Sequence, residues 1–90
     1  MSGSARQVRV EIFGRAGCGL CDEAKAVIAP LRDELGFELV EVDIAQDAAL
    51  EQAYGWDIPV IHVAGQRAFQ HRVDPAALRG QVLRAAEELR

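Results

Sequence analysis

Residues 8–24 read VRVEIFGRAGCGLCDEA, a strand pattern followed by a glycine-containing loop and a closely spaced cysteine pair. Apolar and charged residues alternate over residues 8–13, which is typical of a β-strand with one buried face. From Cys18 onward the apolar residues recur with helical spacing, and Gly36 is the residue type that commonly follows the end of a helix. We therefore expect a strand at 8–13 that leads through the loop into a helix over residues 18–35.

The remaining sequence continues this alternation of strands and helices. We expect further strands over residues 37–44, 60–63 and 68–71 and further helices over residues 47–54 and 75–89. Two strands joined by a helix run parallel, whereas strands joined by a tight turn form an antiparallel hairpin. The predicted order βαβαββα therefore gives an α/β protein with the thioredoxin fold, a small four-stranded mixed sheet with helices on both faces.

Length and composition bound the organisation of the chain. Its 90 residues, half of them hydrophobic, are enough for one core, so we expect a single domain over residues 8–90 behind a flexible N-terminus at residues 1–7. The net charge of −4 and the scattered arginines argue against nucleic-acid binding. No apolar run approaches the roughly 20 residues that span a bilayer. Because we find no export signal, we expect a cytoplasmic protein, and we expect it to be a monomer.

Cys18 and Cys21 carry the chemistry that we expect of this chain. The thiolate is the reactive form of cysteine, and unpaired N–H groups at a helix start favour it. Cys18 stands where the helix begins, with Arg15 three residues earlier, and Cys21 opens the apolar stripe of the helix. We therefore expect Cys18 to be the exposed nucleophile and Cys21 to be the buried resolving thiol. The charges of Asp22 and Glu23 act against a thiolate nearby.

Other interpretations of the cysteine pair are an inert disulfide, a zinc site and an iron–sulfur cluster that bridges two chains with an external thiol. A structural zinc site needs four ligands, and only His62 and His71 could join the two cysteines. A Cys-x-x-Cys pair at a strand-to-helix junction is more typical of a redox-active dithiol. We therefore predict a redox-active dithiol and no bound metal.

Ile58-Pro59 is the second candidate element of the site. We expect a cis peptide bond here, which would leave the Ile58 backbone free to pair with an extended thiol substrate beside Cys18. Trp56 and Tyr54 precede this dipeptide, and they either form an apolar rim near the sulfur or pack in the core.

The chain resembles a glutaredoxin-like family of small bacterial proteins within the thioredoxin superfamily. The resemblance covers residues 8–89, and its most specific part is the C-x-L-C-D-E-A motif that begins at Cys18. It also rests on Ile12-Phe13-Gly14-Arg15, Glu41-Val42-Asp43-Ile44, Tyr54-Gly55, Ile58-Pro59-Val60 and Asp74-Pro75-Ala76-Ala77-Leu78. The resemblance implies the thioredoxin fold and a role in thiol–disulfide exchange.

The resemblance to true glutaredoxins implies a role for four residues. It implies that Cys18 attacks, that Cys21 resolves the mixed disulfide and that Pro59 is the cis-proline. It also implies that Arg15 can meet a carboxylate of glutathione. Together with Ile58, whose backbone we expect to face the substrate, Arg15 and Pro59 are the candidate substrate-binding residues.

Two departures separate the chain from true glutaredoxins and thioredoxins. Glutaredoxins carry a Gly-Gly pair before the last helix, which holds the γ-glutamyl end of glutathione, whereas residues 70–75 here read QHRVDP. Asp74 in this segment either caps the last helix or contacts a ligand. Thioredoxins have a tryptophan directly before the first cysteine and a proline directly before the second, where this chain has Gly17 and Leu20.

The sequence therefore predicts a thiol–disulfide oxidoreductase of glutaredoxin-like type that serves cell redox homeostasis. We expect no bound cofactor, with glutathione as one candidate reductant and a disulfide-containing protein or a small thiol as the partner. Two alternatives stay open, namely a redox-sensing protein-binding module without substantial turnover and an iron–sulfur cluster carrier.

Overall fold

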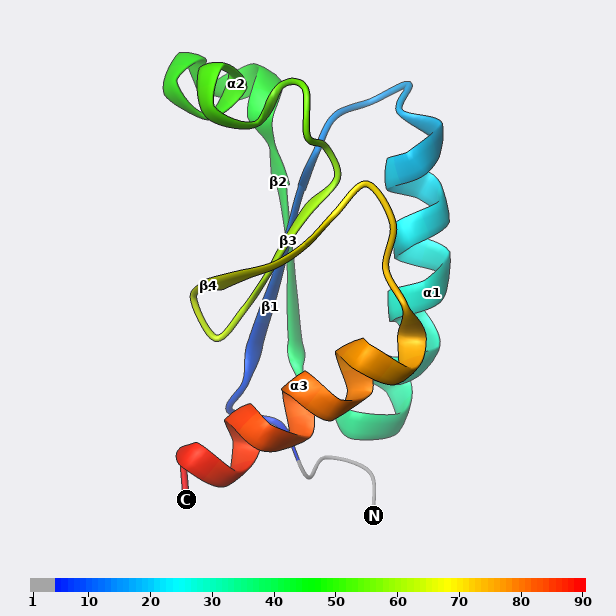
Figure 1. The fold of residues 1–90 in the computed structure, drawn as a ribbon, viewed down its shortest axis with the longest axis vertical. Coiled ribbons are helices and arrows are strands. Elements are labelled where there is room, and N and C mark those ends of the chain that lie inside the picture. The colour runs from blue at the N-terminus through cyan, green and yellow to red at the C-terminus, as the bar shows by residue number, and fades with distance from the viewer. Residues whose placement is uncertain (1–4) are drawn as a thin grey trace.

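The computed structural model describes residues 5–90, which form a four-stranded sheet and three α-helices (Figure 1). In chain order the elements are β1 (Arg9–Gly14), α1 (Gly19–Leu35), β2 (Glu38–Asp43), the 3₁₀-helix η1 (Ile44–Gln46), α2 (Ala48–Tyr54), β3 (Val60–Val63), β4 (Gln66–Gln70) and α3 (Pro75–Glu88). The expected order βαβαββα is therefore confirmed.

The strands follow the order β2-β1-β3-β4 across the sheet. β1 pairs in parallel with β2 and antiparallel with β3, and β3 forms an antiparallel hairpin with β4. The parallel pair is a consequence of α1, which carries the chain back along the sheet before β2 begins. The sheet is therefore mixed, as the sequence predicts.

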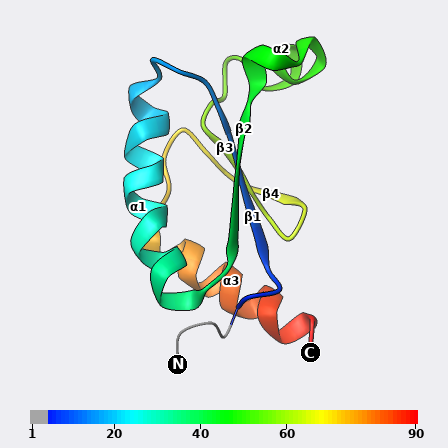
Figure 2. The ribbon, with the colours of Figure 1, turned by 180° about the vertical axis from the view of Figure 1, so that it is seen from behind.

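The larger part of the core lies on the face of the sheet that α1 and α3 cover (Figures 1 and 2). Ile12 of β1 and Ile61 of β3 point to this face and pack with Ile28 of α1 and Leu78 of α3. Each of these side chains is at most 2% exposed, and each such burial stabilises the fold by roughly 1.5–3 kcal/mol. This packing fixes the direction of α1 and with it the position of the cysteine pair at its start.

α2 packs on the opposite face, at the end of the sheet where β1 finishes and β3 begins. Its Leu50 and Tyr54 contact a smaller core cluster of Phe13, Ile44 and Val60. Because successive strand residues point to opposite faces, Phe13 belongs to this cluster while its neighbours in β1 face the other helices. Helices therefore lie on both faces, as expected.

Two aspartates turn the chain between β2 and α2. The Asp43 carboxylate accepts the N–H of Ala45 (2.9 Å), so that Ile44 begins η1 instead of continuing the strand as the sequence pattern predicts. Asp47 then caps α2 by accepting the N–H groups of Ala49 and Leu50. These turns bring the short helix over the end of the sheet.

The β3–β4 hairpin has a two-residue turn. Ala64 and Gly65 have φ values of 52° and 81°, as a two-residue type I′ turn requires, so that Gln66 pairs directly with Val63. β4 therefore begins at Gln66 rather than at Ala68, where the sequence pattern places its start.

Part of the expected flexible N-terminus is packed. Residues 1–4 lie outside the described residues, but Ala5 is 1% exposed and its N–H donates to the carbonyl of Leu35 (2.9 Å). This contact holds the beginning of the described chain against the C-terminal end of α1. Across residues 5–90, no helix combines the length and the apolar character needed to cross a bilayer.

Candidate functional site

Cys18 and Cys21 form a disulfide at the N-terminal end of α1. Their Cα atoms are 5.2 Å apart, within the usual range for a disulfide. Cys18 is half-buried at the N-cap position, whereas Cys21 lies in the first turn and is 1% exposed. The more accessible sulfur therefore belongs to the residue that we expect to be the nucleophile.

The sulfur of Cys18 takes the place of the side-chain oxygen that usually caps a helix. Cys18 Sγ accepts a hydrogen bond from the N–H of Cys21 (3.1 Å). This donor and the helix dipole favour negative charge on the same sulfur once the disulfide is opened. The Glu23 carboxylate, expected to oppose that charge, is paired with Arg72 (3.2 Å), which reduces its repulsion.

Gly14, the last residue of β1, lies against the buried sulfur. A Cβ atom built on Gly14 would come within 2.7 Å of Cys21 Sγ and 3.3 Å of Cys21 Cβ. A larger residue at position 14 would therefore displace the Cys21 side chain. Sequence reasoning placed Gly14 only in the loop that ends the strand, although a glycine at the end of a strand also signals close approach by another group.

Arg15 connects the loop before Cys18 to the segment that follows α2. Its guanidinium donates to the carbonyl of Gly55 (3.4 Å) and lies 3.9 Å from the carboxylate of Glu51. Its side chain is 40% exposed, so Arg15 is both solvated and part of the site's surroundings.

Pro59 is buried beside the end of β1, and its peptide bond with Ile58 is cis, as expected. β1 and β3 pair Phe13 with Val60, so the next position along the two strands sets Pro59 beside Gly14. The fold therefore brings the second candidate element next to the dithiol, although the two are about 40 residues apart in the sequence.

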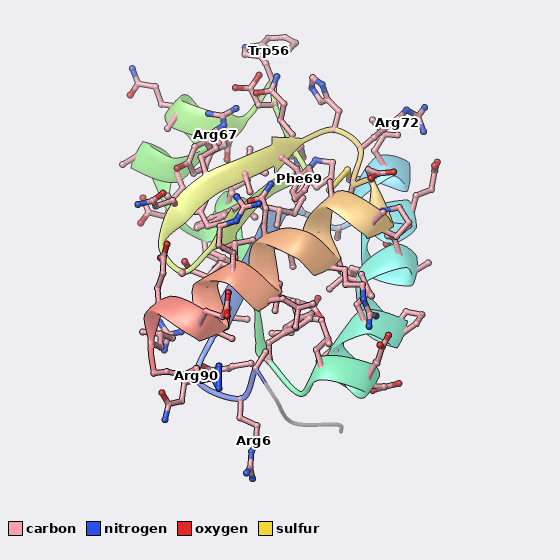
Figure 3. The ribbon with its side chains drawn as sticks, turned by 60° about the horizontal axis from the view of Figure 1, so that its bottom comes forward. Arg6, Trp56, Arg67, Phe69, Arg72 and Arg90 are labelled. Carbon is pink, nitrogen blue, oxygen red and sulfur yellow. A yellow bond between two sulfur atoms is a disulfide. The ribbon has the colours of Figure 1, made fainter. Side chains whose placement is uncertain are left out.

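Trp56 projects from the molecule at the end that holds the site (Figure 3) and is 94% exposed. The core alternative is therefore wrong for this residue. Its carbonyl accepts a hydrogen bond from Nε2 of His71 (3.1 Å), and the backbone N–H of His71 donates to the carbonyl of Pro59 (2.8 Å). His71, which follows β4, thus holds the segment around Trp56, which precedes β3.

Tyr54 packs against the core, and Asp74 caps a helix. The Tyr54 ring packs on Phe13, with ring centroids 5.2 Å apart, and its hydroxyl lies 3.2 Å from Nε2 of His62. The Asp74 carboxylate accepts the N–H of Ala77 (2.8 Å) and caps α3. Core packing for Tyr54 and helix capping for Asp74 are therefore the alternatives that the structure supports.

The two histidines lie in separate surroundings, His62 against Tyr54 and His71 against Trp56. Among residues 5–90, no three His, Cys, Asp or Glu side chains are grouped so that they could hold a metal ion. Sequence reasoning considered His71 only as a zinc ligand and gave Arg72 no role. Both residues reach the site through contacts between distant segments, so no local signal could have identified these contacts.

A family model described as Glutaredoxin-like domain (DUF836) matches residues 9–83. The uncharacterized protein Rv0508 of Mycobacterium tuberculosis is 30% identical over 82 residues, which cover 86% of this chain and 84% of that protein. A protein of Dictyostelium discoideum described as a glutaredoxin-like protein, the YDR286C homolog, is 27% identical over 75 residues, which cover 77% of this chain and 69% of that protein.

Solved structures share the architecture. The X-ray structure of protein XcR50 from X. campestris is 34% identical and superposes with a TM-score of 0.66, over 79% of this chain and 91% of that chain. A mutant thioredoxin from Halobacterium salinarum NRC-1 is 24% identical, with a TM-score of 0.61 over 88% of this chain and 74% of that chain. These likenesses confirm the thioredoxin fold expected from the sequence.

Proposed function

The chain belongs to the family described as Glutaredoxin-like domain (DUF836), and from that premise we propose that it is a thiol–disulfide oxidoreductase whose reacting groups are Cys18 and Cys21. Family membership and the Cys-x-x-Cys pair within a thioredoxin fold support a redox-type module. The observation that carries the finer proposal is the difference between the two sulfurs. One is half-buried at the cap of α1, and the other is 1% exposed directly behind it.

The proposed reaction is a two-step exchange of disulfide bonds. The thiolate of Cys18 attacks one sulfur of the substrate disulfide, whose S–S bond breaks, and the departing sulfur takes up a proton. The Cys21 thiol then loses its proton and attacks Cys18 Sγ. This second step releases the other substrate sulfur as a thiol and forms the Cys18–Cys21 disulfide. Two electrons have then moved from the chain to the substrate.

We assign substrate binding to Arg15, Ile58 and Pro59. Support for this assignment comes from the pairing of β1 with β3, which sets Pro59 beside Gly14 and hence beside the dithiol. Further support comes from Arg15, whose guanidinium donates to the Gly55 carbonyl and so links the loop before Cys18 to the segment that leads to Ile58 and Pro59.

We extend the proposal to the partners and the compartment. A thiol such as glutathione, from outside the chain, returns the Cys18–Cys21 disulfide to the dithiol, so no bound cofactor is needed. The electrons pass to a disulfide-containing protein or to a small disulfide. Because this cycle needs a supply of reduced thiols, we propose that the protein works in the cytoplasm, as a monomer.

The first test follows NADPH consumption when the oxidised protein is mixed with reduced glutathione, glutathione reductase and NADPH. We expect consumption with the wild type and none above background with Cys18→Ser. Serine can still cap α1, so the variant should stay folded while it loses the nucleophile. Circular dichroism checks the fold. If Cys18→Ser consumes NADPH as fast as the wild type, the mechanism is wrong.

The second test uses Cys21→Ser, in which the resolving thiol is missing. Because the mixed disulfide on Cys18 can no longer be resolved from within, we expect it to accumulate and to be visible as a mass increase of one substrate thiol less two hydrogens. If Cys21→Ser instead releases its substrate at the wild-type rate, Cys21 is not the resolving group. If the wild type exchanges with no disulfide at all, the proposed oxidoreductase activity is wrong.

A further inference from the structure

Trp56 is the most exposed large apolar side chain among residues 5–90. It is 94% exposed, compared with 49% for Leu89 and 36% for Leu83. Burying an aromatic ring of this size lowers the free energy, so an almost fully exposed tryptophan is a feature that requires an explanation. Single, half-exposed leucines are normal on a protein surface and require no such explanation.

The backbone around Trp56 is held in place although its ring is free. The Trp56 carbonyl accepts from Nε2 of His71 (3.1 Å), and the carbonyl of the preceding Gly55 accepts from Arg15 (3.4 Å). The base of the side chain is therefore fixed from both sides. A contact group that is already positioned loses less entropy when it binds a partner.

The same hydrogen bonds tie Trp56 to the dithiol end of the molecule. Arg15 belongs to the loop that leads into the Cys18 cap, and the residue after His71, Arg72, pairs with Glu23 in the first turns of α1 (3.2 Å). In Figure 3, Trp56 and Arg72 lie at one end of the molecule, and Arg6 and Arg90 lie at the other.

Arginines at the dithiol end of the molecule are paired with carboxylates. Three ion pairs lie at this end, Arg15–Glu51, Arg67–Asp57 and Arg72–Glu23, at 3.9, 3.1 and 3.2 Å. Each of these three cations therefore already has an anion beside it. These paired arginines therefore offer little attraction to an acidic partner, and Trp56 is the contact at this end that requires an explanation.

We propose that Trp56 is a specificity-determining contact that favours disulfides carried by polypeptides over small disulfides. The inference rests on the proposed function. A small disulfide that reacts at Cys18 is too short to cover a ring on the neighbouring loop as well. A polypeptide extends beyond its reacting sulfur and can bury the ring, and buried tryptophans are among the strongest single contacts in protein interfaces.

The exchange itself is unchanged by this contact. The reduced chain gives two electrons to the polypeptide disulfide, one S–S bond breaks in the polypeptide and one forms between Cys18 and Cys21. Trp56 acts by holding the polypeptide while its sulfur meets Cys18.

The experiment compares two substrates in single turnovers of the reduced protein, with insulin as the polypeptide disulfide and bis(2-hydroxyethyl) disulfide as the small one. Acid quenching and alkylation report the oxidation of Cys18 and Cys21. For Trp56→Ala we expect the ratio of the insulin rate constant to the small-disulfide rate constant to fall about tenfold or more. The control is Leu89→Ala, an exposed apolar residue at the other end, which should keep the wild-type ratio.

The outcomes separate the inference from the proposed function. An unchanged ratio in Trp56→Ala, with both substrates still reduced, overturns the role of Trp56 and leaves the oxidoreductase proposal standing. If the wild type reduces neither substrate, the proposed function fails and the inference falls with it.

A second readout leaves Trp56 in place. It is the only tryptophan of the chain, so its fluorescence reports its own surroundings. We expect the Cys21→Ser variant trapped as a mixed disulfide with insulin to emit at shorter wavelength than the same variant trapped with 2-mercaptoethanol. Equal emission from the two adducts would contradict burial of Trp56 by the polypeptide.

Discussion

Gly14 is a single residue whose missing side chain makes room for the buried sulfur. It ends β1 and has no unusual φ, so the need for glycine here is one of space rather than of backbone freedom. Cys21 Sγ occupies this space, because it lies only 2.7 Å from the position that a Cβ atom on Gly14 would take. The size of the side chain at position 14 therefore decides whether Cys21 Sγ can keep the position in which it is bonded to Cys18.

Gly14→Ala should lower both the stability of the protein and the stability of its disulfide. Overpacking of this kind costs about 1–3 kcal/mol of the free energy of unfolding, measured by urea titration. In the reduced form Cys21 can rotate away from the added methyl group, so we expect a larger reduced fraction in a given glutathione buffer. Alkylation and mass spectrometry measure that fraction.

Gly80→Ala in α3 is the matched control, because it lies outside the cysteine motif and a Cβ there would meet nothing within 4 Å beyond its chain neighbours and its own helix backbone. It should leave the reduced fraction close to that of the wild type. If Gly14→Ala behaves like Gly80→Ala in both measurements, the contact with Cys21 has no energetic effect.

Among the elements, α3 depends on a single side-chain cap. Asp74 accepts the N–H of Ala77 (2.8 Å), and Pro75 fills the first helical position, where a missing N–H costs nothing. The helix needs this support because most of its surface faces solvent and only a few of its residues, among them Leu78 and Val82, reach the core.

Asp74→Ala should lower the free energy of unfolding by about 1 kcal/mol, whereas Asp74→Asn should lose less because it can still cap the helix. Chemical denaturation of the three proteins measures both differences. A loss of exchange rate without a loss of stability would instead favour the alternative in which Asp74 contacts a ligand.

For the molecule as a whole, stability rests on a small core with one cluster on each face of the sheet. Domains of this size have a net stability of about 5–15 kcal/mol, so one large cavity removes a substantial share of it. Leu78→Ala, at a position with 0% exposure, should cost about 2–5 kcal/mol, seen as a lower melting temperature. Leu83→Ala, in the same helix but 36% exposed, should change the stability by about 0.5 kcal/mol or less. Similar losses for the two variants would contradict the burial of Leu78 in the core.

The order of elements could be predicted from the sequence because its signals are local. The strand pattern, the glycine loop and the Cys18-x-x-Cys21 spacing lie within one short segment, and each follows from backbone geometry. The start of β4 could not be predicted in the same way. Gln66 and Arg67 are polar residues of an edge strand, and they enter the ladder only because the turn at 64–65 is so short.

The surroundings of the dithiol were also less predictable, because they depend on contacts between residues far apart in the sequence. Arg72 meets Glu23 across 49 residues of sequence, and Arg15 meets Gly55 across 40. Such contacts arise only when α1, β3 and β4 are already in place. The sequence therefore identifies the two cysteines, whereas the exposure of Trp56 follows from how three distant segments are assembled.

The packing of Ala5 against Leu35 has a practical consequence for anyone who wishes to tether the protein. It sets the first described residues at the C-terminal end of α1, and the chain's last residues lie at that same end, opposite the cysteine pair (Figures 1 and 2). The molecule is 37 Å along its longest axis. A carrier domain, a resin or an electrode joined through the last residue would therefore sit at the far pole, with the reactive sulfurs directed outward into solution.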